Sequence, residues 1–384
     1  MTLQLGSSCT INPAPAARDP RRILMTVDAV GGVWRYTMDL ARSLDGLGVR
    51  TALIGFGPPP SRTQKAEADA SRIPLRWAGL PLDWMPGGLA AASDARIQIA
   101  RAAADFKADL VHVNSLAYAG PEIRQAIVAV GHSCIPTWWR GVHDCEAPAQ
   151  WRRHLRENAT GLRSAAIILA PSQSHARDLQ VAYGPGLDIR VVYNASAASP
   201  AFRRRREPLV FAAGRWWDEA KNARALDSAA ELTRWPVLMA GSLQDPAGPR
   251  VSLNHARALG ALDAATTREW MRRASVFASP SIYEPFGLAV LEAARASTPL
   301  VLADIATFRE LWDGAALFAA AKEPSAFADA IERLMVDAGL RRRLARRARE
   351  RAAYFTLERQ AEGVLAAYRA ALETRAGETL RSAI

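Results

Sequence analysis

Short apolar runs alternate with longer amphipathic stretches along most of the chain. The first run, RRILMTVD at residues 21–28, is followed by Gly31 and Gly32 and then by a helical pattern that begins at about Trp34. Apolar positions that recur every three to four residues favour helices, whereas short continuous apolar runs favour buried strands. Strands that alternate with helices predict a parallel sheet covered on both faces.

The apolar runs fall into two series, which the charged segment AFRRRREP at residues 201–208 separates. We expect this segment to link two domains. Each series predicts a doubly wound, Rossmann-like parallel sheet, so the expected fold class is α/β with two such domains facing each other across a cleft. The first series is VRTALIGF, DLVHVNS, IPTWWRGVHD, AAIILAPS and IRVVYNA, and the second is PLVFAAGR, WPVLMAGS, ASVFASPS, PLVLAD and AALFAA.

The composition is ordinary for a globular protein. The 384 residues are 49% hydrophobic and 23% charged, with no apolar run long enough to span a bilayer. The first 20 residues lack the apolar core of a secretory signal, and their Ser, Pro and Ala content predicts a disordered leader. The cysteines Cys9, Cys134 and Cys145 form no C-x-x-C pair and fit reduced thiols. We therefore expect a cytoplasmic protein.

The formal net charge of +11 raises the question of an acidic partner. Lysine occurs only at positions 65, 107, 221 and 322, so the excess is nearly all arginine and indicates a chain-wide bias. The densest cluster, LRRRLARRARERAA at residues 340–353, predicts a helix with a solvated face. We expect no nucleic-acid binding, while peripheral contact with the inner face of a membrane stays open as an alternative.

Two H-x-C pairs, His132 with Cys134 and His143 with Cys145, raise the question of a zinc site. Residues 135–142 are interpreted as a strand, and at about 3.3 Å per residue this strand separates the pairs by roughly 30 Å. One ion cannot bridge that distance. We expect no metal site and no cofactor.

The stretch SPSIYEPFGLAVLEAARA at residues 279–296 holds Glu284 and Glu292 in apolar surroundings. A helix is expected from Phe286 to residue 296, with Glu284 just before it and Glu292 in its middle. A buried carboxylate needs either fixed protein donors or the hydroxyls of a ligand. Gly287 allows close approach of a ligand, and the free N–H groups at the helix start suit a phosphate.

Two cations follow the first strand of the second series, in the segment GRWWDEAKN. Arg215 supplies a forked donor and Lys221 a point charge, a combination that suits a diphosphate. A surface ion pair of Lys221 with Asp218 or Glu219 is the alternative. His143 is expected to end a strand, which places it with the others at the cleft.

The run EPFGLAVLEA, with glutamates eight positions apart, resembles the E-x7-E signature of retaining glycosyltransferases of family 4 (group 1), which have the GT-B fold. Further resemblances follow in order along most of the chain. They imply an acceptor-side domain at 21–202, a nucleotide-sugar donor domain at 203–355 and a final helix at 356–384 that packs back on the first domain. The segments are GGVWRYTMDLARSL, DLVHVNS, GVHD, LAPSQSHARDL, VVYNA, AAGRWWDEAKN and YFTLERQAEGVLAAYRAAL.

The resemblance also implies roles for single residues. Glu292 is expected to accept hydrogen bonds from the ribose hydroxyls of a nucleotide sugar, and Glu284 to contact hydroxyls of the donor sugar. Arg215 and Lys221 are expected to hold the diphosphate. His143 is expected to line the sugar site, with a satisfied core histidine as the alternative. The backbone groups expected near the donor are those of Gly31, Gly32, Phe286, Gly287 and Leu288.

The implied activity is transfer of a sugar, with retention, from a nucleotide-diphosphate sugar to a saccharide, lipid-linked or small-molecule acceptor, without a metal. Ala195, Asn222 and the pair Ser297-Thr298 stand where the family often has glycine. A sugar phosphorylase or nucleotide-sugar epimerase of the same fold, and a non-catalytic nucleotide-sugar-binding protein, are the alternatives. Several tryptophans could either stack on sugar rings or pack in the core. They are Trp77, Trp84, Trp138, Trp139, Trp216 and Trp217.

Overall fold

The structure, a computed structural model, describes residues 19–197, 206–246 and 248–382. The expected leader at residues 1–20 lies almost entirely outside the described residues. Most of the expected linker at 201–208 lies outside them as well, and its last two residues begin a strand.

The N-terminal domain is built on a seven-stranded sheet in the order β3-β2-β1-β4-β5-β6-β7, with every neighbouring pair parallel. The central strands are almost entirely buried, as expected for a sheet covered on both faces. The strand bounds are β1 (Arg22–Asp28), β2 (Arg50–Phe56), β3 (Leu75–Trp77), β4 (Leu110–Val113), β5 (Ala126–Val130), β6 (Ile167–Ala170) and β7 (Ile189–Val191).

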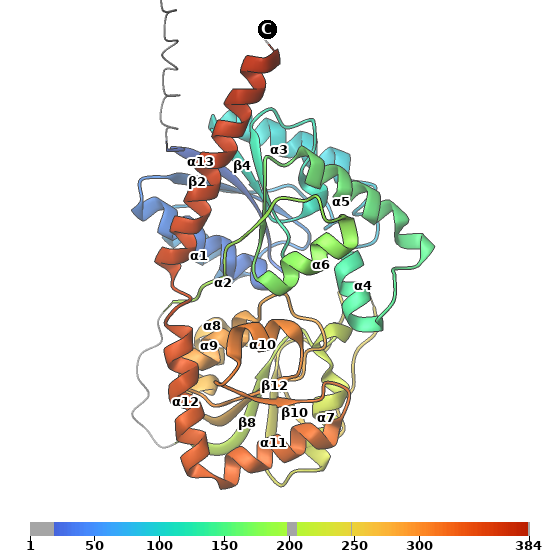
Figure 1. The fold of residues 1–384 in the computed structure, drawn as a ribbon, viewed down its shortest axis with the longest axis vertical. Coiled ribbons are helices and arrows are strands. Elements are labelled where there is room, and N and C mark those ends of the chain that lie inside the picture. Colours follow the sequence, from blue (N-terminus) through green and yellow to red (C-terminus); the bar gives the residue numbers. More distant parts are fainter. Residues whose placement is uncertain (1–18, 198–205, 247, 383–384) are drawn as a thin grey trace, which may run out of the picture.

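Helices cover both faces of this sheet and enclose two apolar cores (Figure 1). One core joins Val111 of β4 to Ile99, and the other joins Met25 of β1 to Leu40. The helices are α1 (Gly32–Gly46), α2 (Arg62–Ala70), α3 (Ala92–Phe106), α4 (Ile135–His143), α5 (Arg152–Ser164) and α6 (Gln173–Tyr183), with 3-10 turns η1 (Leu116–Tyr118) and η2 (Ala149–Trp151).

The C-terminal domain repeats this design on a six-stranded parallel sheet in the order β10-β9-β8-β11-β12-β13. The predicted α/β class with two Rossmann-like sheets is thereby confirmed. The strands are β8 (Glu207–Ala213), β9 (Val237–Ala240), β10 (Arg257–Gly260), β11 (Ala274–Ser279), β12 (Leu300–Ala303) and β13 (Leu317–Ala319). The helices are η3 (Glu219–Lys221), α7 (Ala223–Glu231), α8 (Ala264–Arg273), α9 (Leu288–Arg295), α10 (Ala306–Trp312), α11 (Pro324–Val336) and α12 (Ala338–Ala352).

The last helix, α13 (Leu357–Ser382), leaves the C-terminal domain and runs along the N-terminal one (Figure 1). Val364 and Ala371 are buried in the core beside β1. The Tyr368 hydroxyl lies 2.8 Å from Nδ1 of His112 on β4. Apolar packing and a buried polar contact therefore both hold this helix on the N-terminal sheet.

The strand predicted at residues 135–142 is wrong, because this segment forms helix α4. Pro136 lies in the first turn, where a missing N–H is harmless, and the Thr137 hydroxyl accepts a hydrogen bond from the Cys134 N–H. The strand in this region is β5, whose five residues are all buried and precede the helix. His143 therefore ends a helix and not a strand.

Candidate active site

Side chains and loops from the two domains meet at the carboxyl ends of the two sheets. Glu310 of α10 accepts hydrogen bonds from the backbone N–H groups of Gln173 (2.9 Å) and Ser174 (2.6 Å) at the start of α6. The Ser172 hydroxyl donates to the Pro285 carbonyl at 2.7 Å. These contacts fasten the loop after β6 to the segment that carries Glu284.

Lys221 and Glu284 form an ion pair between two loops of the C-terminal domain. Lys221 ends η3 after β8, and Glu284 lies between β11 and α9. Their side chains are 18% and 16% exposed, so water screens the pair only in part. Lys221 therefore pairs with Glu284, and the alternative pairing with Asp218 or Glu219 is wrong.

Asp218 instead contacts and orients the Arg215 side chain. Its carboxylate lies 3.1 Å from Nη2 of Arg215 and accepts a hydrogen bond from the Trp138 indole at 2.9 Å. Trp138 belongs to α4 of the N-terminal domain, so this contact crosses the interface. The guanidinium also lies over the Trp217 ring, 5.4 Å from its centroid. Arg215 is thus oriented by Asp218 and Trp217 of its own domain, and the N-terminal domain holds Asp218 through Trp138.

The glycine loop after β1 approaches Arg215 closely. A Cβ atom at Gly31 would lie 2.8 Å from Nη1 of Arg215, so a larger residue would displace the guanidinium. A Cβ at Gly32 would lie 3.3 Å from a methyl group of Leu288. The loop and the first turn of α9 therefore face each other across the cleft.

Helix α9 begins at Leu288, two residues later than predicted. Gly287 has φ +91°, in the left-handed region that side chains disfavour, and this conformation delays the start of the helix. Phe286 is 2% exposed and packs in the core, with its ring centroid 5.6 Å from that of Phe355. Only the backbone groups of Phe286 and Gly287 can therefore serve a ligand.

The loop before α9 is also held from the N-terminal domain. The Tyr283 hydroxyl lies 2.8 Å from the hydroxyl of Thr137 and 3.2 Å from that of Ser133. Tyr283 is buried in a small cluster with Val142. Together with the contact from the loop after β6, these bonds fix the segment on both sides of Glu284.

Glu292 lies in the middle of α9, as predicted, and is half-buried. Burial raises the pKa of Glu292, and the nearby guanidinium groups of Arg268 and Arg35 oppose that shift. Within the described part of the chain, no hydrogen bond or ion pair reaches its carboxylate. The carboxylate is therefore left to accept hydrogen bonds from a ligand.

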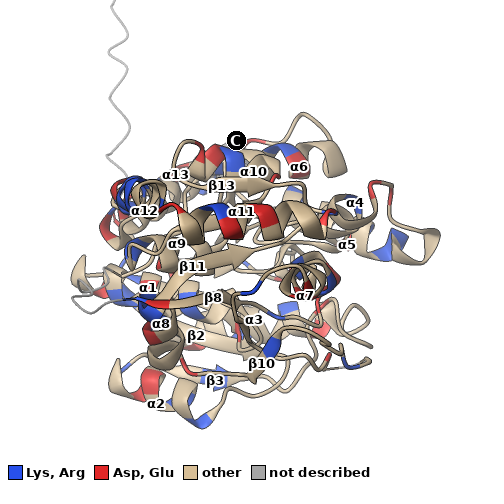
Figure 2. Ribbon diagram, turned by 90° about the horizontal axis from the view of Figure 1, so that it is seen from below, with Lys and Arg blue, Asp and Glu red and all other residues tan. Residues whose placement is uncertain are grey.

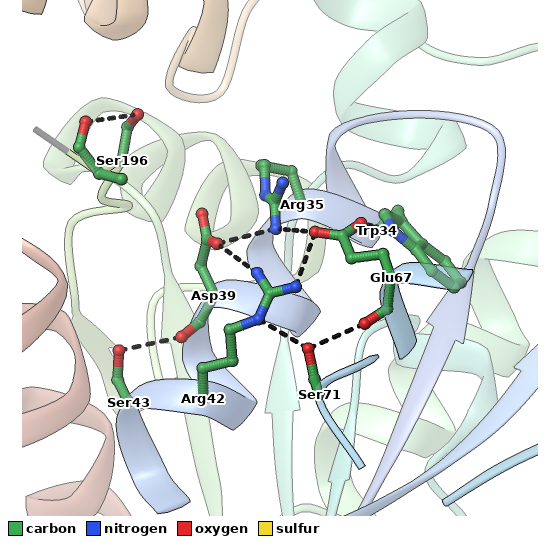
Figure 3. A network of polar contacts seen from close by, with 9 residues as sticks. Trp34, Arg35, Asp39, Arg42, Ser43, Glu67, Ser71 and Ser196 are labelled. Atoms are coloured by element: carbon green, nitrogen blue, oxygen red, sulfur yellow. Dashed lines mark hydrogen bonds and ion pairs between the residues drawn. The ribbon is translucent and has the colours of Figure 1, made fainter. Parts of the chain in front are cut away.

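Arg35 itself is held in a polar network on α1 and α2 (Figure 3). Its Nη2 lies 2.9 Å from the Asp39 carboxylate and 2.6 Å from that of Glu67. Burial opposes ionisation of Glu67, but hydrogen bonds from Trp34 and the neighbouring guanidinium groups lower its pKa. The network keeps Arg35 turned toward its own domain and leaves Glu292 without a direct partner.

His143, predicted to end a strand and to line the sugar site, lies exposed at the end of α4. Its ring centroid is 4.3 Å from that of Trp139, and Nε2 is 3.9 Å from the Glu219 carboxylate across the interface. The core-histidine alternative is wrong, because the residue is exposed. Its place at the sugar site stays a prediction. The histidine that does follow a strand is His132, after β5, where its ring lies 2.9 Å from the Asn114 side-chain oxygen.

A cavity of about 390 Å³ opens beside Arg215, at a place that the sequence did not indicate. Gly241 and Ser242, which follow β9 in the segment WPVLMAGS, could have signalled it as a glycine turn at a strand end. The lining includes Val30 of the N-terminal domain, Trp217, Gly241, Ser242, Leu262 and Thr267. The candidate site at Arg215 therefore includes a cavity with a partly apolar lining.

Two of the three positions where the family often has glycine have left-handed backbone. Asn222 has φ +54° and donates to the carbonyls of Pro280 (3.1 Å) and Ala321 (2.7 Å), and Ser297 has φ +59°. Asparagine is among the non-glycine residues that adopt this conformation most readily. Asn222 thus replaces a glycine and at the same time anchors the end of η3. Ala195 is buried and has no such backbone.

The tryptophans divide between core and cleft. Trp216 is 3% exposed and donates to a backbone carbonyl of β9, which makes it a core residue. Trp84 and Trp217 are half-buried and stack across the domain interface, with ring centroids 6.1 Å apart. Trp77 donates its indole N–H to the Gly57 carbonyl. Stacking on a ligand is therefore open to Trp84 and Trp217.

Among the described residues, no group of three or more His, Cys, Asp or Glu side chains could hold a metal ion. The distance estimate against zinc assumed a strand, and that premise is wrong, because nine helical residues rise only about 13 Å. In the same part of the chain, no helix is both long and apolar enough to cross a membrane.

Two family models of one group match the chain. The model described as Glycosyltransferase Family 4 matches residues 30–196, and the model described as Glycosyl transferases group 1 matches residues 207–337. The chain belongs to the family 4, group 1 glycosyltransferases. The predicted resemblance is thereby confirmed.

A relative by sequence agrees with this family, and solved structures share the fold. A D-inositol 3-phosphate glycosyltransferase of Kribbella flavida is 31% identical over 61% of this chain and 63% of its own length. The match thus spans less than two thirds of that relative. Sucrose-phosphate synthase from Thermosynechococcus elongatus has a similar structure, with a TM-score of 0.75 and 18% identity over 91% of this chain and 98% of its own.

A second solved structure, Anabaena Alr3699/HepE in complex with UDP and glucose, has a TM-score of 0.69 and 18% identity over 94% of this chain and 100% of its own. At such low identity these structures show that the fold is shared. The two sheets, their cleft and the family match together establish the GT-B fold of this chain.

Proposed function

We propose that the protein transfers a sugar from a nucleotide-diphosphate sugar to a hydroxyl group of an acceptor. The observation that carries this proposal is the meeting of Arg215, Lys221 and Glu284 at one edge of the C-terminal sheet, closed by the loop at Gly31. Two cations beside a glycine loop suit a diphosphate, and a carboxylate beside them suits sugar hydroxyls.

The donor nucleotide is proposed to lie in the cavity beside Arg215, with its ribose at Glu292. The unpartnered carboxylate of Glu292 supports this placement, because a ribose diol offers two hydrogen-bond donors. The solved structure from Anabaena is in complex with UDP and glucose, which supports a nucleotide in the same fold.

Chemically, the bond between the anomeric carbon and the diphosphate oxygen breaks, and its electron pair leaves with the diphosphate. The acceptor hydroxyl attacks the anomeric carbon from the same face and gives its proton to the leaving phosphate. This course retains the configuration and needs no covalent nucleophile. Arg215, Lys221 and backbone N–H groups at Gly287 would stabilise the charge that develops on the diphosphate.

We propose that no metal ion or other cofactor takes part. The support is that Arg215 and Lys221 place two fixed positive charges where the leaving group gains negative charge. We also place the reaction in the cytoplasm, since Cys134 and Cys145 are free thiols and Cys145 is exposed.

Contact with an anionic membrane is a further part of the proposal. The exposed arginines of α12 gather along one helix of the C-terminal domain (Figure 2). Such a stripe attracts acidic lipid headgroups. Cosedimentation with phosphatidylglycerol vesicles tests it: binding should fade as salt is added, and equal binding to neutral vesicles would contradict it.

Release of nucleoside diphosphate from UDP-, GDP- and ADP-glucose, with and without acceptors, tests the proposed activity. A glycosyltransferase should release nucleotide slowly by hydrolysis and faster with an acceptor. A phosphorylase would instead require inorganic phosphate, and an epimerase would change the sugar. Binding of a nucleotide sugar without any turnover would favour the non-catalytic alternative.

A further inference from the structure

We propose that the acceptor is an uncharged polyhydroxylated molecule, and that a phosphate group is excluded from the acceptor side of the cleft. This inference rests on the proposed function and deepens it. It differs from a simple transfer of the relatives' substrates, since a D-inositol 3-phosphate glycosyltransferase and a sucrose-phosphate synthase are named for phosphorylated compounds.

The N-terminal side of the cleft carries two carboxylates. Asp28 ends β1, is half-buried and accepts the Val30 N–H at 2.9 Å. Asp83 is half-buried in the loop after β3, where the His154 ring donates to its backbone carbonyl at 2.8 Å. Asp28 ends β1 and Asp83 follows β3 of the same sheet, and besides burial the Asp28 charge helps to raise the pKa of Asp83. Both acids therefore lie at the carboxyl edge of the N-terminal sheet, which faces Arg215.

Both carboxyls are poorly solvated. Burial raises the pKa of Asp28, and the Val30 N–H and Arg215 oppose the shift. Burial likewise raises the pKa of Asp83, and His154 opposes it. Of these opposing groups, Arg215 is already paired with an aspartate of its own domain and assigned to the donor diphosphate. If Asp28 and Asp83 are ionised, they repel a phosphate that enters here. If they are protonated, they are neutral and offer the phosphate no positive charge.

A buried hydroxyl points to a ligand at the same place. Tyr118 is 3% exposed, and its hydroxyl has no partner at hydrogen-bond geometry in the described part of the chain. The Asp83 backbone N–H acts on the phenolic oxygen, but among the residues that the structure describes no acceptor receives the O–H. The carboxylates that act on this hydroxyl are those of Asp83 and Asp28. A buried O–H without an acceptor lowers the stability of the folded protein unless a bound molecule supplies the acceptor.

The position of this hydroxyl is fixed by packing. The Phe56 ring at the end of β2 has its centroid 4.7 Å from that of Tyr118. Tyr118 ends the 3-10 turn η1, whose three residues are all buried. The phenol therefore keeps one place beside the two acids, as a recognition group needs to do.

The combination of groups fits a polyol. Carboxylate oxygens accept hydrogen bonds from hydroxyl groups, and a phenol can donate to or accept from a hydroxyl. The half-buried rings of Trp84 and Trp217 flank the cleft and can cover the apolar face of a sugar or cyclitol. Acids, phenol and indoles together recognise a neutral polyhydroxylated ring.

Three matched pairs of probes test the inference: myo-inositol with D-myo-inositol 3-phosphate, glucose with glucose 6-phosphate, and fructose with fructose 6-phosphate. Binding to the full chain is measured by calorimetry or ligand-observed NMR with UDP, GDP or ADP present in excess. At least one neutral probe should bind, and about tenfold or more tightly than its phosphorylated partner. Binding of no neutral probe, or equal or tighter binding of the phosphorylated partner, would overturn the inference.

Two variants separate recognition from folding. Tyr118→Phe removes an O–H that has no acceptor in the described ranges of the chain, so the protein should lose little stability. A loss of neutral-probe binding in this variant then reports a contact with the ligand. Asp83→Asn should reduce the ratio between the dissociation constants of the phosphorylated and the neutral probe. Asp94→Asn, an exposed carboxylate on α3, is the matched control and should change nothing. Unchanged probe binding in both Tyr118→Phe and Asp83→Asn would overturn the assignment.

Nucleotide binding shows whether a negative result concerns the proposed function or only the acceptor class. If UDP, GDP and ADP all fail to bind, the proposed function fails and this inference fails with it. If a nucleotide binds and the phosphorylated probes are preferred, the proposed function stands and only the acceptor class is wrong.

Discussion

Lys221 and Glu284, 63 positions apart in the sequence, form an ion pair at the carboxyl edge of the C-terminal sheet. The pair joins the turn after β8 to the loop before α9. Both side chains are largely shielded from water, so in the unliganded protein each charge is stabilised mainly by the other. A diphosphate sugar that enters this edge would offer Lys221 a phosphate and Glu284 a sugar hydroxyl.

The variant Lys221→Ala should lower turnover about 100- to 1000-fold, the usual effect of removing one transition-state donor. Its effect on nucleotide-sugar binding should be smaller, because Arg215 and Glu292 remain. Initial rates of nucleotide release and the dissociation constant of the donor check both. Lys322→Ala, an exposed lysine of the same domain, is the control and should behave as wild type. Equal rates in the Lys221 and Lys322 variants would contradict the assignment.

Glu292→Gln should stabilise the unliganded protein and weaken donor binding. Burial raises the pKa of Glu292 above its ordinary 4.5, so the folded state binds a proton more tightly than the unfolded state. The stability linked to that proton is present below pH 4.5 and is lost as pH rises through the raised pKa. The variant should therefore be more stable than wild type at neutral pH.

Urea unfolding of wild type and Glu292→Gln from acid to neutral pH checks that sign. The advantage of the variant should shrink toward acid pH, where wild-type Glu292 is protonated. A difference that stays constant over this range would show that the carboxylate is not desolvated as described. Calorimetry at neutral pH should show weaker donor binding by the variant in parallel.

Tyr283→Phe removes hydroxyl contacts to Thr137 and Ser133, which join the two domains. The loss should cost about 1 kcal/mol of stability. It should also raise the KM for the donor, because the segment carrying Glu284 is less firmly held. Thermal unfolding and initial rates at varied donor concentration check the two effects.

Tyr183→Phe is the matched control for this variant, since the Tyr183 hydroxyl bonds Asn158 and Cys134 within the N-terminal domain. It should lose similar stability with an unchanged KM. A raised KM in both variants would point to general destabilisation and not to the contact between domains.

Glu310→Ala removes the carboxylate that receives two N–H groups at the start of α6. The unliganded protein should then open more readily, with a larger radius of gyration in small-angle scattering and a higher KM for the donor. Asp263→Ala removes a comparable carboxylate at the start of α8, but within one domain. That variant should keep the wild-type radius of gyration, and an equal change in both would contradict a closing role for Glu310.

Much of the fold was predictable because buried parallel strands leave continuous apolar runs. RRILMTVD and PLVLAD each gave a strand, β1 and β12, close to the expected bounds. The segment IPTWWRGVHD failed because its apolar residues occupy one side of a helix, with Thr137 and Val142 buried and Arg140 exposed. Periodicity over nine residues did not separate that helix from a strand.

The place of a candidate site residue in the fold was predictable where a single local segment determines it. Gly287, Glu292 and Lys221 each follow or lie in a strand-end turn or helix that the sequence marks. The partner of Lys221 and the position of His143 depend on contacts between distant segments, which local patterns do not encode. His132 was considered only as a metal ligand and not as a strand-end residue, because the buried run of β5 before it was not recognised as a strand.

We propose that the cleft binds a nucleotide-diphosphate sugar, held between Arg215, Lys221 and the Gly31 loop with its ribose on Glu292. A crystal structure of the protein with a bound nucleotide sugar tests this assignment most directly. Density for the diphosphate is expected beside both cations, with the ribose hydroxyls within hydrogen-bond distance of Glu292. An empty cleft at saturating donor, or a nucleotide bound away from these residues, would contradict it.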